Sequence, residues 1–245
     1  MLDELSRNIY QRQIILPELG EAGQERLGSA SVLVVGCGGL GSPLLLYLAA
    51  MGIGRLGLVD GDLVSLSNLN RQILYGPEDV GQPKAQQAAA RLRQLNPRLK
   101  LEVYPEYLTR ENAARLLAGY DMAADCLDNF GARLILNDAC LDAGLPFVHA
   151  GVSHLSGQSM TVLPGRTPCL RCLFGDSLPE TQAAAGIIGP TPGLLACVQV
   201  TEIYKYFCGL PPNPGLLLYD GQRMETRTLE LRPNPDCRCQ QLGKK

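Results

Sequence analysis

The sequence lacks long hydrophobic runs, a clear excess of charge of either sign, and histidine in quantity. The longest apolar stretch, residues 43–53, is too short to cross a bilayer, and the acidic residues 1–7 contain no apolar core typical of a secretory signal. The net charge of -2 gives no reason to expect nucleic acid as the main partner. The two histidines, His149 and His154, form no motif with a nucleophile. These absences predict a cytoplasmic protein that binds neither membranes nor, directly, nucleic acid.

Disulfide bonds are not expected either. The nine cysteines are an odd number, which in a cytoplasmic chain argues against a disulfide framework. Hydrophobic residues make up 46% and charged residues 19% of the 245 residues, so the chain can bury a large globular core. Five cysteines stand singly in apolar or helical surroundings and are predicted to be small buried side chains: Cys37, Cys126, Cys140, Cys197 and Cys208.

An apolar run at 31–35 predicts a buried strand, which leads into a glycine-rich turn and a helix over 44–51. This order is the context of a dinucleotide-type G-x-G-x-x-G turn, because the backbone can approach a phosphate and the helix N-terminus attracts an anion. Asp60 ends the next strand, where an acid usually takes ribose hydroxyls. We expect NAD or ATP here; the alternative is a turn that only packs the helix on the strand. The turn residues are Gly36, Gly38, Gly39, Leu40 and Gly41.

A polar stretch at 61–72 predicts a loop at the carboxyl edge of the sheet, where open α/β folds bind ligands. Asn68 and Arg71 are three residues apart, so one helical turn would face both to one side. A helix is predicted over 85–95, which places Lys84 at the positive end of its dipole. That position is unfavourable for a cation unless an anion is bound there; the alternative is an exposed surface lysine.

Strands and helices alternate along the first half, which predicts an α/β, Rossmann-like fold with a mostly parallel sheet and helices on both faces. Two late segments, 216–220 and 226–231, predict antiparallel strands at the C-terminal side. The connection over 164–192 is long and rich in Gly, Pro, Ala and Thr, which is typical of a functional or mobile loop. The other helices are expected at 3–10, 21–27, 111–117, 133–143 and 193–207, and the other strands at 99–104, 122–129, 147–152 and 159–163.

Four cysteines form two close pairs, Cys169 with Cys172 and Cys237 with Cys239. Four thiolates suit a tetrahedral structural zinc ion, which would tie the long loop to the C-terminal part of the chain. The second pair has one intervening residue. In an extended strand its two side chains would point the same way, and the small separation of their sulfur atoms would fit zinc less easily. We expect zinc; the alternative is two unrelated pairs of thiols.

Together these motifs resemble one family along nearly the whole chain: the E1-like adenylyltransferases of sulfur-carrier proteins, the MoeB/ThiF/HesA group, which are relatives of ubiquitin-activating enzymes. So many motifs in one order make the resemblance highly specific. It implies a single domain over 1–245, with a nucleotide-binding core at about 28–163 and a zinc, crossover and carrier-binding part at about 164–245. The matching segments are 10–13 (YQRQ), 36–41 (GCGGLG), 60–62 (DGD), 65–72 (SLSNLNRQ), 81–84 (GQPK), 125–129 (DCLDN), 169–172 (CLRC) and 185–193.

The resemblance implies a homodimer that binds Mg-ATP and activates the C-terminal carboxylate of a small ubiquitin-like sulfur carrier ending in Gly-Gly. The products are an acyl-adenylate and pyrophosphate. By this resemblance, adenosine is bound by Gly39, Gly41 and Asp60, and the phosphates are bound by Asn68, Arg71 and Lys84. Asp128 matches the aspartate that is linked to Mg²⁺, and Arg12 matches an arginine that extends into the active site of the partner subunit. The implied nucleotide site also includes Gly36, Gly38, Leu40, Asp62, Gln72 and Asn129.

This chemistry needs no nucleophilic side chain, because the carrier's carboxylate is ionised at neutral pH, with a pKa of about 3.5. The barrier is the approach of an anion to the α-phosphate, which Mg²⁺ and three catalytic cations, Arg12, Arg71 and Lys84, would offset. The sequence departs from the family in the mobile loop. Many members carry a Cys there that forms a bond to the carrier, whereas this chain has Thr181 and Gln182. We expect the acyl-adenylate to pass to a separate sulfur donor, with no thioester at this position.

Three other functions explain less of the sequence than this one. An NAD-dependent oxidoreductase would explain the glycine turn but would leave Asn68, Arg71 and Lys84 without a role. An inactive scaffold is disfavoured because Arg71, Lys84 and Asp128 are intact. A related enzyme acting on a tRNA base is disfavoured by the near-neutral charge and by the cysteine pairs.

Overall fold

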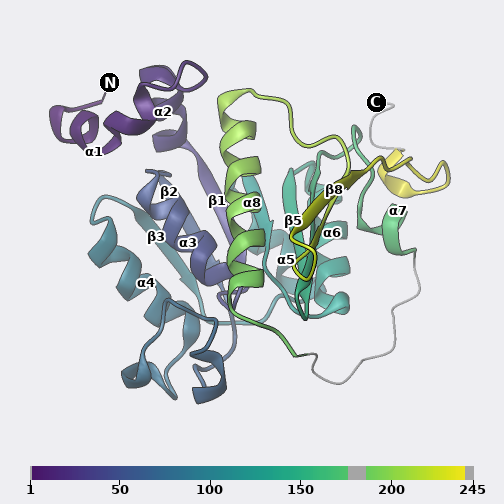
Figure 1. The fold of residues 1–245 in the computed structure, drawn as a ribbon, viewed down its shortest axis with the longest axis horizontal. Helices are drawn as coiled ribbons and strands as arrows, with labels where there is room; N and C mark the ends of the chain where they lie inside the picture. The colour runs from purple at the N-terminus through teal and green to yellow at the C-terminus, as the bar shows by residue number, and fades with distance from the viewer. Residues whose placement is uncertain (1, 176–185, 241–245) are drawn as a thin grey trace.

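The computed structural model describes residues 2–175 and 186–240. Eight strands form one sheet in the order β3-β2-β1-β4-β5-β6-β7-β8 (Figure 1). Strands β1 to β5 run parallel, and β6, β7 and β8 add to the β5 edge as antiparallel strands. The bounds are β1 Ser31–Val35, β2 Arg55–Val59, β3 Lys100–Tyr104, β4 Met122–Asp125, β5 Phe147–Ser153, β6 Ser156–Val162, β7 Leu216–Asp220 and β8 Glu225–Leu229.

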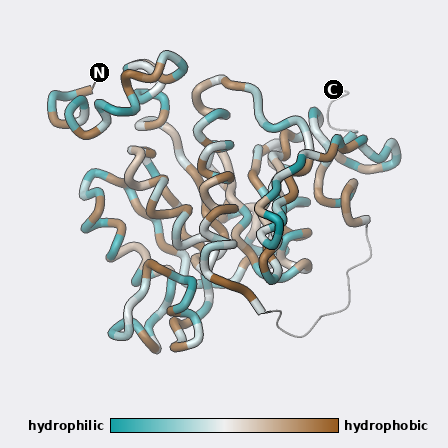
Figure 2. Tube along the Cα trace, viewed as in Figure 1, coloured by the Kyte–Doolittle hydropathy of each residue, from teal (hydrophilic) through white to brown (hydrophobic). Residues whose placement is uncertain are grey.

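Helices cover both faces of the sheet, with α3, α4 and α8 on one face and α5 and α6 on the other (Figure 1). Side chains of β1 alternate between the two resulting cores, Val32 and Val34 toward the first and Leu33 and Val35 toward the second. Figure 2 shows hydrophobic residues along the central strands and more hydrophilic ones on α1. The helices are α1 Glu4–Ile14, α2 Gly20–Ser29, α3 Gly41–Ala50, α4 Lys84–Leu95, α5 Arg110–Leu117, α6 Phe130–Ala143, α7 Leu170–Phe174 and α8 Pro190–Cys208, with short 3-10 turns η1 Leu66–Asn68, η2 Pro77–Asp79 and η3 Arg238–Gln240.

Local sequence signals fix the helix ends near the site. The side chain of Asn129 accepts a hydrogen bond from the Ala132 N–H and so caps the start of α6. Gly144 closes the same helix in the left-handed conformation, with φ +64°, as its position in the sequence predicts. The two caps hold α6 beside the end of β4.

The predicted fold class is confirmed: an α/β, Rossmann-like, mostly parallel sheet with late antiparallel strands. Some expectations are wrong in detail. Helix α3 begins inside the glycine turn rather than at residue 44, and β4 ends at Asp125, so 126–129 is a loop. Cys197 is exposed and Cys208 is half-buried, because both lie off the buried stripe of α8.

The strand order reverses between β1 and β4. The chain moves outward from β1 to β3 and then returns to the other side of β1, which is the switch point where open α/β sheets bind ligands at the carboxyl ends of their strands. The glycine turn after β1 and the 126–129 loop after β4 therefore lie side by side at the same edge of the sheet.

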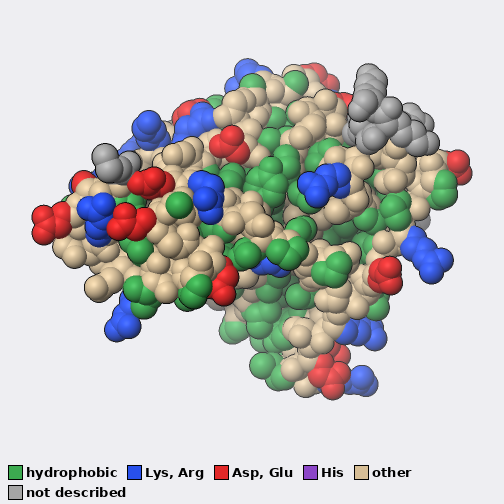
Figure 3. Space-filling view, turned by 90° about the horizontal axis from the view of Figure 1, so that it is seen from above, with side chains coloured by type: hydrophobic (Ala, Val, Ile, Leu, Met, Phe, Trp, Pro, Cys, Tyr) green, Lys and Arg blue, Asp and Glu red, His purple; other side chains and the backbone are tan. Residues whose placement is uncertain are grey.

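The molecular surface has no dominant charge. Seen from above, hydrophobic side chains gather in the middle of the face, and charged side chains of both signs lie mostly toward its edges (Figure 3). No helix within 2–175 and 186–240 combines the length and apolar character that crossing a membrane requires.

Candidate nucleotide site and cysteine cluster

Two glycines of the turn close it against the fold. Gly36 has φ +97°, and a Cβ there would lie 2.5 Å from the carbonyl oxygen of Cys126. Gly41, the first residue of α3, lies so close to the Gly36 carbonyl that no side chain fits. Leu40 between the turn and the helix is buried in the core. These positions are therefore set by packing, whatever binds nearby.

The other two glycines face the loop that follows β2. A Cβ on Gly39 would lie 3.5 Å from Arg71 Cγ and from Pro192 Cγ, and one on Gly38 would lie 3.6 Å from Gln72 Nε2. Gln72 is buried, and its Oε1 has no hydrogen-bond partner within the described part of the chain. A buried acceptor beside a glycine turn fits a nucleotide, whose hydroxyl or amino group would donate to it.

Asp60 ties the turn to the loop after β2. Its Oδ2 accepts the N–H of Cys37 at 2.7 Å, and its Oδ1 accepts the N–H of Asp62 at 2.8 Å. Burial raises the pKa of the Asp60 carboxyl. Each oxygen keeps a second lone pair, so the carboxylate can also accept ribose hydroxyls as the sequence predicts.

Lys84 is the first residue of α4, and its side chain is buried. Its Nζ donates to Asp62 Oδ2 at 2.8 Å, while the Tyr107 hydroxyl donates to Asp62 Oδ1 at 2.7 Å. Burial raises the pKa of Asp62, but these two hydrogen bonds outweigh it and lower the pKa overall. Within the chain Asp62 supplies an anion beside Lys84, and the alternative of an exposed surface lysine is wrong.

Arg71 lies one turn beyond the 3-10 helix η1. Its backbone N–H donates to the Asn68 carbonyl at 3.0 Å, which confirms the predicted helical turn joining these two residues. The Arg71 guanidinium donates to the Ser67 carbonyl at 2.9 Å and to Asn70 Oδ1 at 3.2 Å. The side chain is held by its own loop with its stem against the glycine turn.

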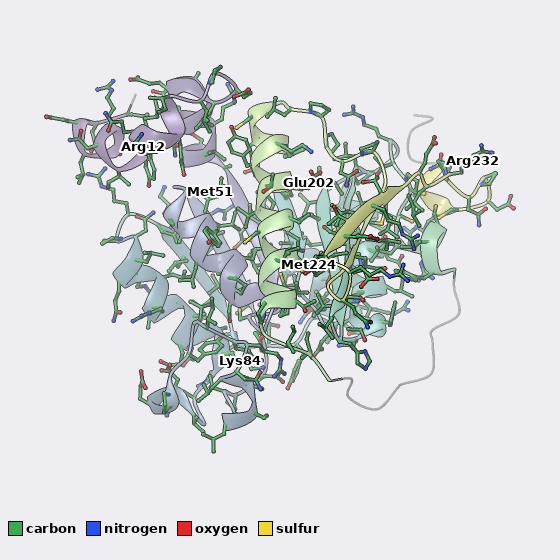
Figure 4. All side chains as sticks on the ribbon, viewed as in Figure 1. Arg12, Met51, Lys84, Glu202, Met224 and Arg232 are labelled. Carbon is green, nitrogen blue, oxygen red and sulfur yellow. The ribbon has the colours of Figure 1, made fainter. Side chains whose placement is uncertain are left out.

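Asp128 is exposed in the loop after β4, and a single exposed carboxylate fits Mg²⁺, which usually keeps several waters and phosphate oxygens. The neighbouring Asn129 uses its side-chain oxygen to cap α6. Arg12 is exposed on α1, and Figure 4 shows it far from Lys84, at the other end of the molecule. One subunit therefore does not bring its own Arg12 together with the other predicted site residues.

The four paired cysteines converge. Their Sγ atoms all lie within 4.8 Å of one another. The Sγ atoms of Cys169 and Cys237 are 3.6 Å apart, and those of Cys172 and Cys239 are 3.5 Å apart. Four thiolates at about 2.3 Å from a tetrahedral zinc ion would be about 3.8 Å apart. The donor set and its spacing fit a structural zinc ion.

The second cysteine pair is not in an extended strand, so the short sulfur–sulfur spacing of a strand does not apply to it. Cys239 lies in the 3-10 helix η3, and this turn lets the short spacing reach the first pair. The first pair is fastened to α6, where Arg171 pairs with Asp138 at 2.7 Å and the Leu170 N–H donates to Asn137 Oδ1 at 2.9 Å. The cluster thus joins the C-terminal segment to the sheet through α6.

Sequence reasoning missed several residues because no motif marks them. The hydroxyl of buried Tyr75 donates to the Cys37 carbonyl at 2.8 Å and lies 3.3 Å from the Lys84 carbonyl, so it links the turn to α4. Burial raises the pKa of the Tyr75 hydroxyl well above its ordinary value. Two Tyr side chains, Tyr75 and Tyr107, therefore set the positions of the turn and of Asp62.

The sheet order and the glycine turn at its switch point define a Rossmann-like nucleotide-binding protein. The model of the ThiF family matches residues 10–239. The chain belongs to the ThiF family, which confirms the resemblance inferred from the motifs.

Named relatives cover almost all of this chain. It is 47% identical to mouse "Adenylyltransferase and sulfurtransferase MOCS3", covering 96% of this chain and 52% of the relative. It is 45% identical to the Thermus thermophilus "Sulfur carrier protein adenylyltransferase", covering 96% and 90%. It is 42% identical to the Haloferax volcanii "SAMP-activating enzyme E1", covering 96% and 89%. The chain spans about half the length of the MOCS3 relatives that it matches.

Solved structures share the fold. PaaA superimposes with a TM-score of 0.80 at 25% identity, covering 94% of this chain and 75% of that one. Escherichia coli MccB, solved with ATP, superimposes with a TM-score of 0.85 at 21% identity, covering 98% and 77%.

Proposed function

We propose that this chain adenylylates the C-terminal carboxylate of a small ubiquitin-like sulfur carrier ending in Gly-Gly, with release of pyrophosphate from ATP. One observation supports this most directly. Two cations, Arg71 and Lys84, flank a glycine turn at the switch point of the sheet, beside the buried carboxylate of Asp60. The relatives named "Sulfur carrier protein adenylyltransferase" and "SAMP-activating enzyme E1" support the choice of ATP over NAD.

In the proposed reaction the carrier provides the nucleophile, and the protein binds and orients the nucleotide. The carrier's carboxylate attacks the α-phosphate, and the bond to the pyrophosphate breaks. Gly38 and Gly39 let the nucleotide approach the backbone, while Arg71 and Lys84 hold the departing phosphates. Mg²⁺ bound near Asp128 would neutralise phosphate charge. Asn68, at the start of the Arg71 turn, adds a neutral hydrogen-bonding group.

Lys84 changes partner in this proposal. Its ammonium pairs with Asp62 within the chain, at 2.8 Å. Asp62 is about half exposed on its side chain and keeps a second partner in the Tyr107 hydroxyl, so it can release the lysine to a phosphate without being left unpaired. The internal pair holds the buried cation in place before nucleotide binds.

Arg12 completes the site from a second subunit in this proposal. It is exposed on α1, far from its own Lys84 (Figure 4). The same helix and the residues after it expose Ile9, Ile15 and Leu16, which is apolar surface that a homodimer would bury.

The rest of the predicted organisation is proposed with it. Residues 1–245 act as one ThiF unit, in which about 28–163 hold the nucleotide and about 164–245 hold zinc and the carrier. The acyl-adenylate passes to a separate sulfur donor, because Gln182 stands at the position of the family cysteine; Gln182 lies outside the described residues. The cytoplasmic location stays a prediction.

The test is ATP–pyrophosphate exchange with a ubiquitin-like carrier ending in Gly-Gly from the same organism. We expect exchange that depends on the carrier and is lost when its last glycine is removed. Arg71→Ala and Lys84→Ala should each lower the exchange rate by about 10²–10³, as loss of one transition-state donor does. Lys100→Ala, an exposed lysine on β3, should leave the rate unchanged. Exchange that is absent, or independent of the carrier, would refute the proposal.

The separate-donor step has its own test. After incubation with ATP and carrier, the denatured protein should show no conjugate that a thiol cleaves. A thiol-sensitive conjugate on a denaturing gel would contradict this step while leaving the adenylylation intact.

A further inference from the structure

A cavity of about 530 Å³ lies where the late strands meet α6. A row of directly paired residues crosses its floor from β5 to β8: Gly151 pairs with Gln158, Gln158 with Leu218, and Leu218 with Arg227. Directly paired residues of a sheet share a face, and all four of these line the cavity. The floor therefore combines one residue without a side chain with two long polar ones.

Arg133 of α6 supplies a buried cation to the wall of this cavity. Its Nη2 donates to the carbonyl of Leu127, one residue before Asp128. Its Nε has no hydrogen-bond partner within the described residues, and the nearest acid, Asp125, lies 3.8 Å from it, beyond hydrogen-bond distance. A buried donor without a partner is costly, so an acceptor on a ligand would be bound favourably here.

Gln158 is oriented by a buried relay. Nδ1 of His149 lies 2.6 Å from Asp125 Oδ2, and since a carboxylate only accepts, Nδ1 carries the proton. Burial lowers the pKa of His149, so Nε2 is an acceptor for the Gln158 amide N–H at 3.2 Å. This contact turns the amide N–H of Gln158 toward His149, so the amide oxygen can accept an N–H from a ligand in the cavity that Gln158 lines.

The cluster is close to electrically neutral. The carboxylate of Asp125 compensates the guanidinium of Arg133, and His149 is uncharged. A site that offers one donor and one acceptor and has no net charge suits a neutral peptide group better than it suits the carboxylate of a ligand.

Gly151 limits what can lie on the floor. A Cβ there would lie 3.0 Å from Arg133 Nη1 and 3.5 Å from Gln158 Cγ. Any side chain at 151 would therefore occupy the space between the two polar groups. A ligand that reaches both of them must be thin at this point, as an extended glycine backbone is.

We propose that Arg133 and Gln158 bind the peptide groups of the carrier's C-terminal tail, and that Gly151 makes the cavity selective for small residues there. This inference depends on the proposed adenylylation and adds the residues that select its substrate. The Arg133 contact with Leu127 places the tail beside Asp128, where the terminal carboxylate would meet the nucleotide.

The experiment measures KM for the carrier and for ATP by pyrophosphate exchange, and Kd for ATP without carrier by titration. Gln158→Leu and Arg133→Gln should each raise the carrier KM by about 10- to 100-fold, the loss expected for hydrogen bonds that involve buried or charged groups. In Gln158→Leu the Kd for ATP should stay within about twofold, because Gln158 lies on β6 in the cavity lining and not in the glycine turn. Gly151→Ala should follow the same pattern, and Arg91→Ala, an exposed arginine on α4, should change nothing.

The outcomes separate this inference from the proposed function. Carrier-dependent exchange by the natural chain, with an unchanged carrier KM in Gln158→Leu, would overturn the inference and leave the function standing. No carrier-dependent exchange by the natural chain would overturn both. Gln158→Leu leaves the Asp125–Arg133 contact in place, so it decides the matter if Arg133→Gln fails to fold.

Discussion

Replacing Gly39 by Ala separates a nucleotide-binding turn from one that only packs a helix on a strand. The added Cβ would meet Arg71 Cγ and Pro192 Cγ at 3.5 Å, which is ordinary van der Waals contact, and the backbone of Gly39 is not in the left-handed region. The fold should therefore accept Ala at this position. A ligand that approaches the same backbone should not, because the methyl group occupies its space.

The magnitudes follow from these contacts. Gly→Ala at a compatible position changes the stability of a fold by less than about 1 kcal/mol, which is about 2–4 °C in Tm for a chain of this size. An extra methyl group in a fitted site costs about 1–3 kcal/mol, or about 5- to 150-fold in the Kd for ATP. We expect a Tm within about 4 °C of that of the natural chain and clearly weaker binding of Mg-ATP.

Two further variants calibrate the measurement, which combines thermal melting with titration of ATP. Gly28→Ala in α2 has nothing within 4 Å of the new Cβ, so it should keep the Kd for ATP and gain slightly in Tm. Gly41→Ala would meet the carbonyl of Gly36 and should lose the fold. If Gly39→Ala binds ATP within about twofold of the natural chain, the turn serves packing alone and the assignment of the site is wrong.

Two more predictions concern the metal and the dimer. The purified chain should contain about one zinc ion; Cys239→Ser should lose it and melt at lower temperature, while Cys197→Ser, exposed on α8, should keep both the zinc and the Tm. Full zinc content in Cys239→Ser would contradict the cluster. Arg12→Ala and Lys84→Ala should each be inactive alone. An equal mixture of the two after subunit exchange should regain about a quarter of the natural activity, because about half of the dimers are then heterodimers and each of these has one of its two sites intact. No recovery after subunit exchange would show that Arg12 does not act across the dimer.

The fold followed from the sequence because its signals are local and repeated. The strand at 31–35, the glycine turn and the cap at Gly144 each depend on a few adjacent residues, and the structure has them where they were predicted. The boundaries shifted where tertiary contacts decide them. Helix α3 starts early because Gly41 can pack on the Gly36 carbonyl, and β4 ends early because Cys126 turns toward the same glycine. The exposure of Cys197 depends on how α8 is rotated against the sheet, which a single cysteine does not indicate.

The polar contacts of the site were harder to predict, because their partners are distant in sequence. The motif identifies Lys84 and Asp62 as site residues, but only the folded chain shows that they neutralise each other across 22 positions. The same holds for Arg133. Neither its distance from Asp125 nor the lack of a partner for its Nε within 2–175 and 186–240 has a signature in the sequence.

The four glycines of the motif are required for different reasons, so a match to the motif alone does not show that a chain binds a nucleotide. Gly36 and Gly41 are required by the close approach of backbone to backbone, so a ThiF-like chain without a ligand would still need them. Gly38 and Gly39 face side chains at ordinary contact distances, so packing alone would admit Ala at both. Glycine at these two positions is therefore better evidence for a nucleotide than the whole pattern is, because only a ligand supplies a reason to keep the methyl group out.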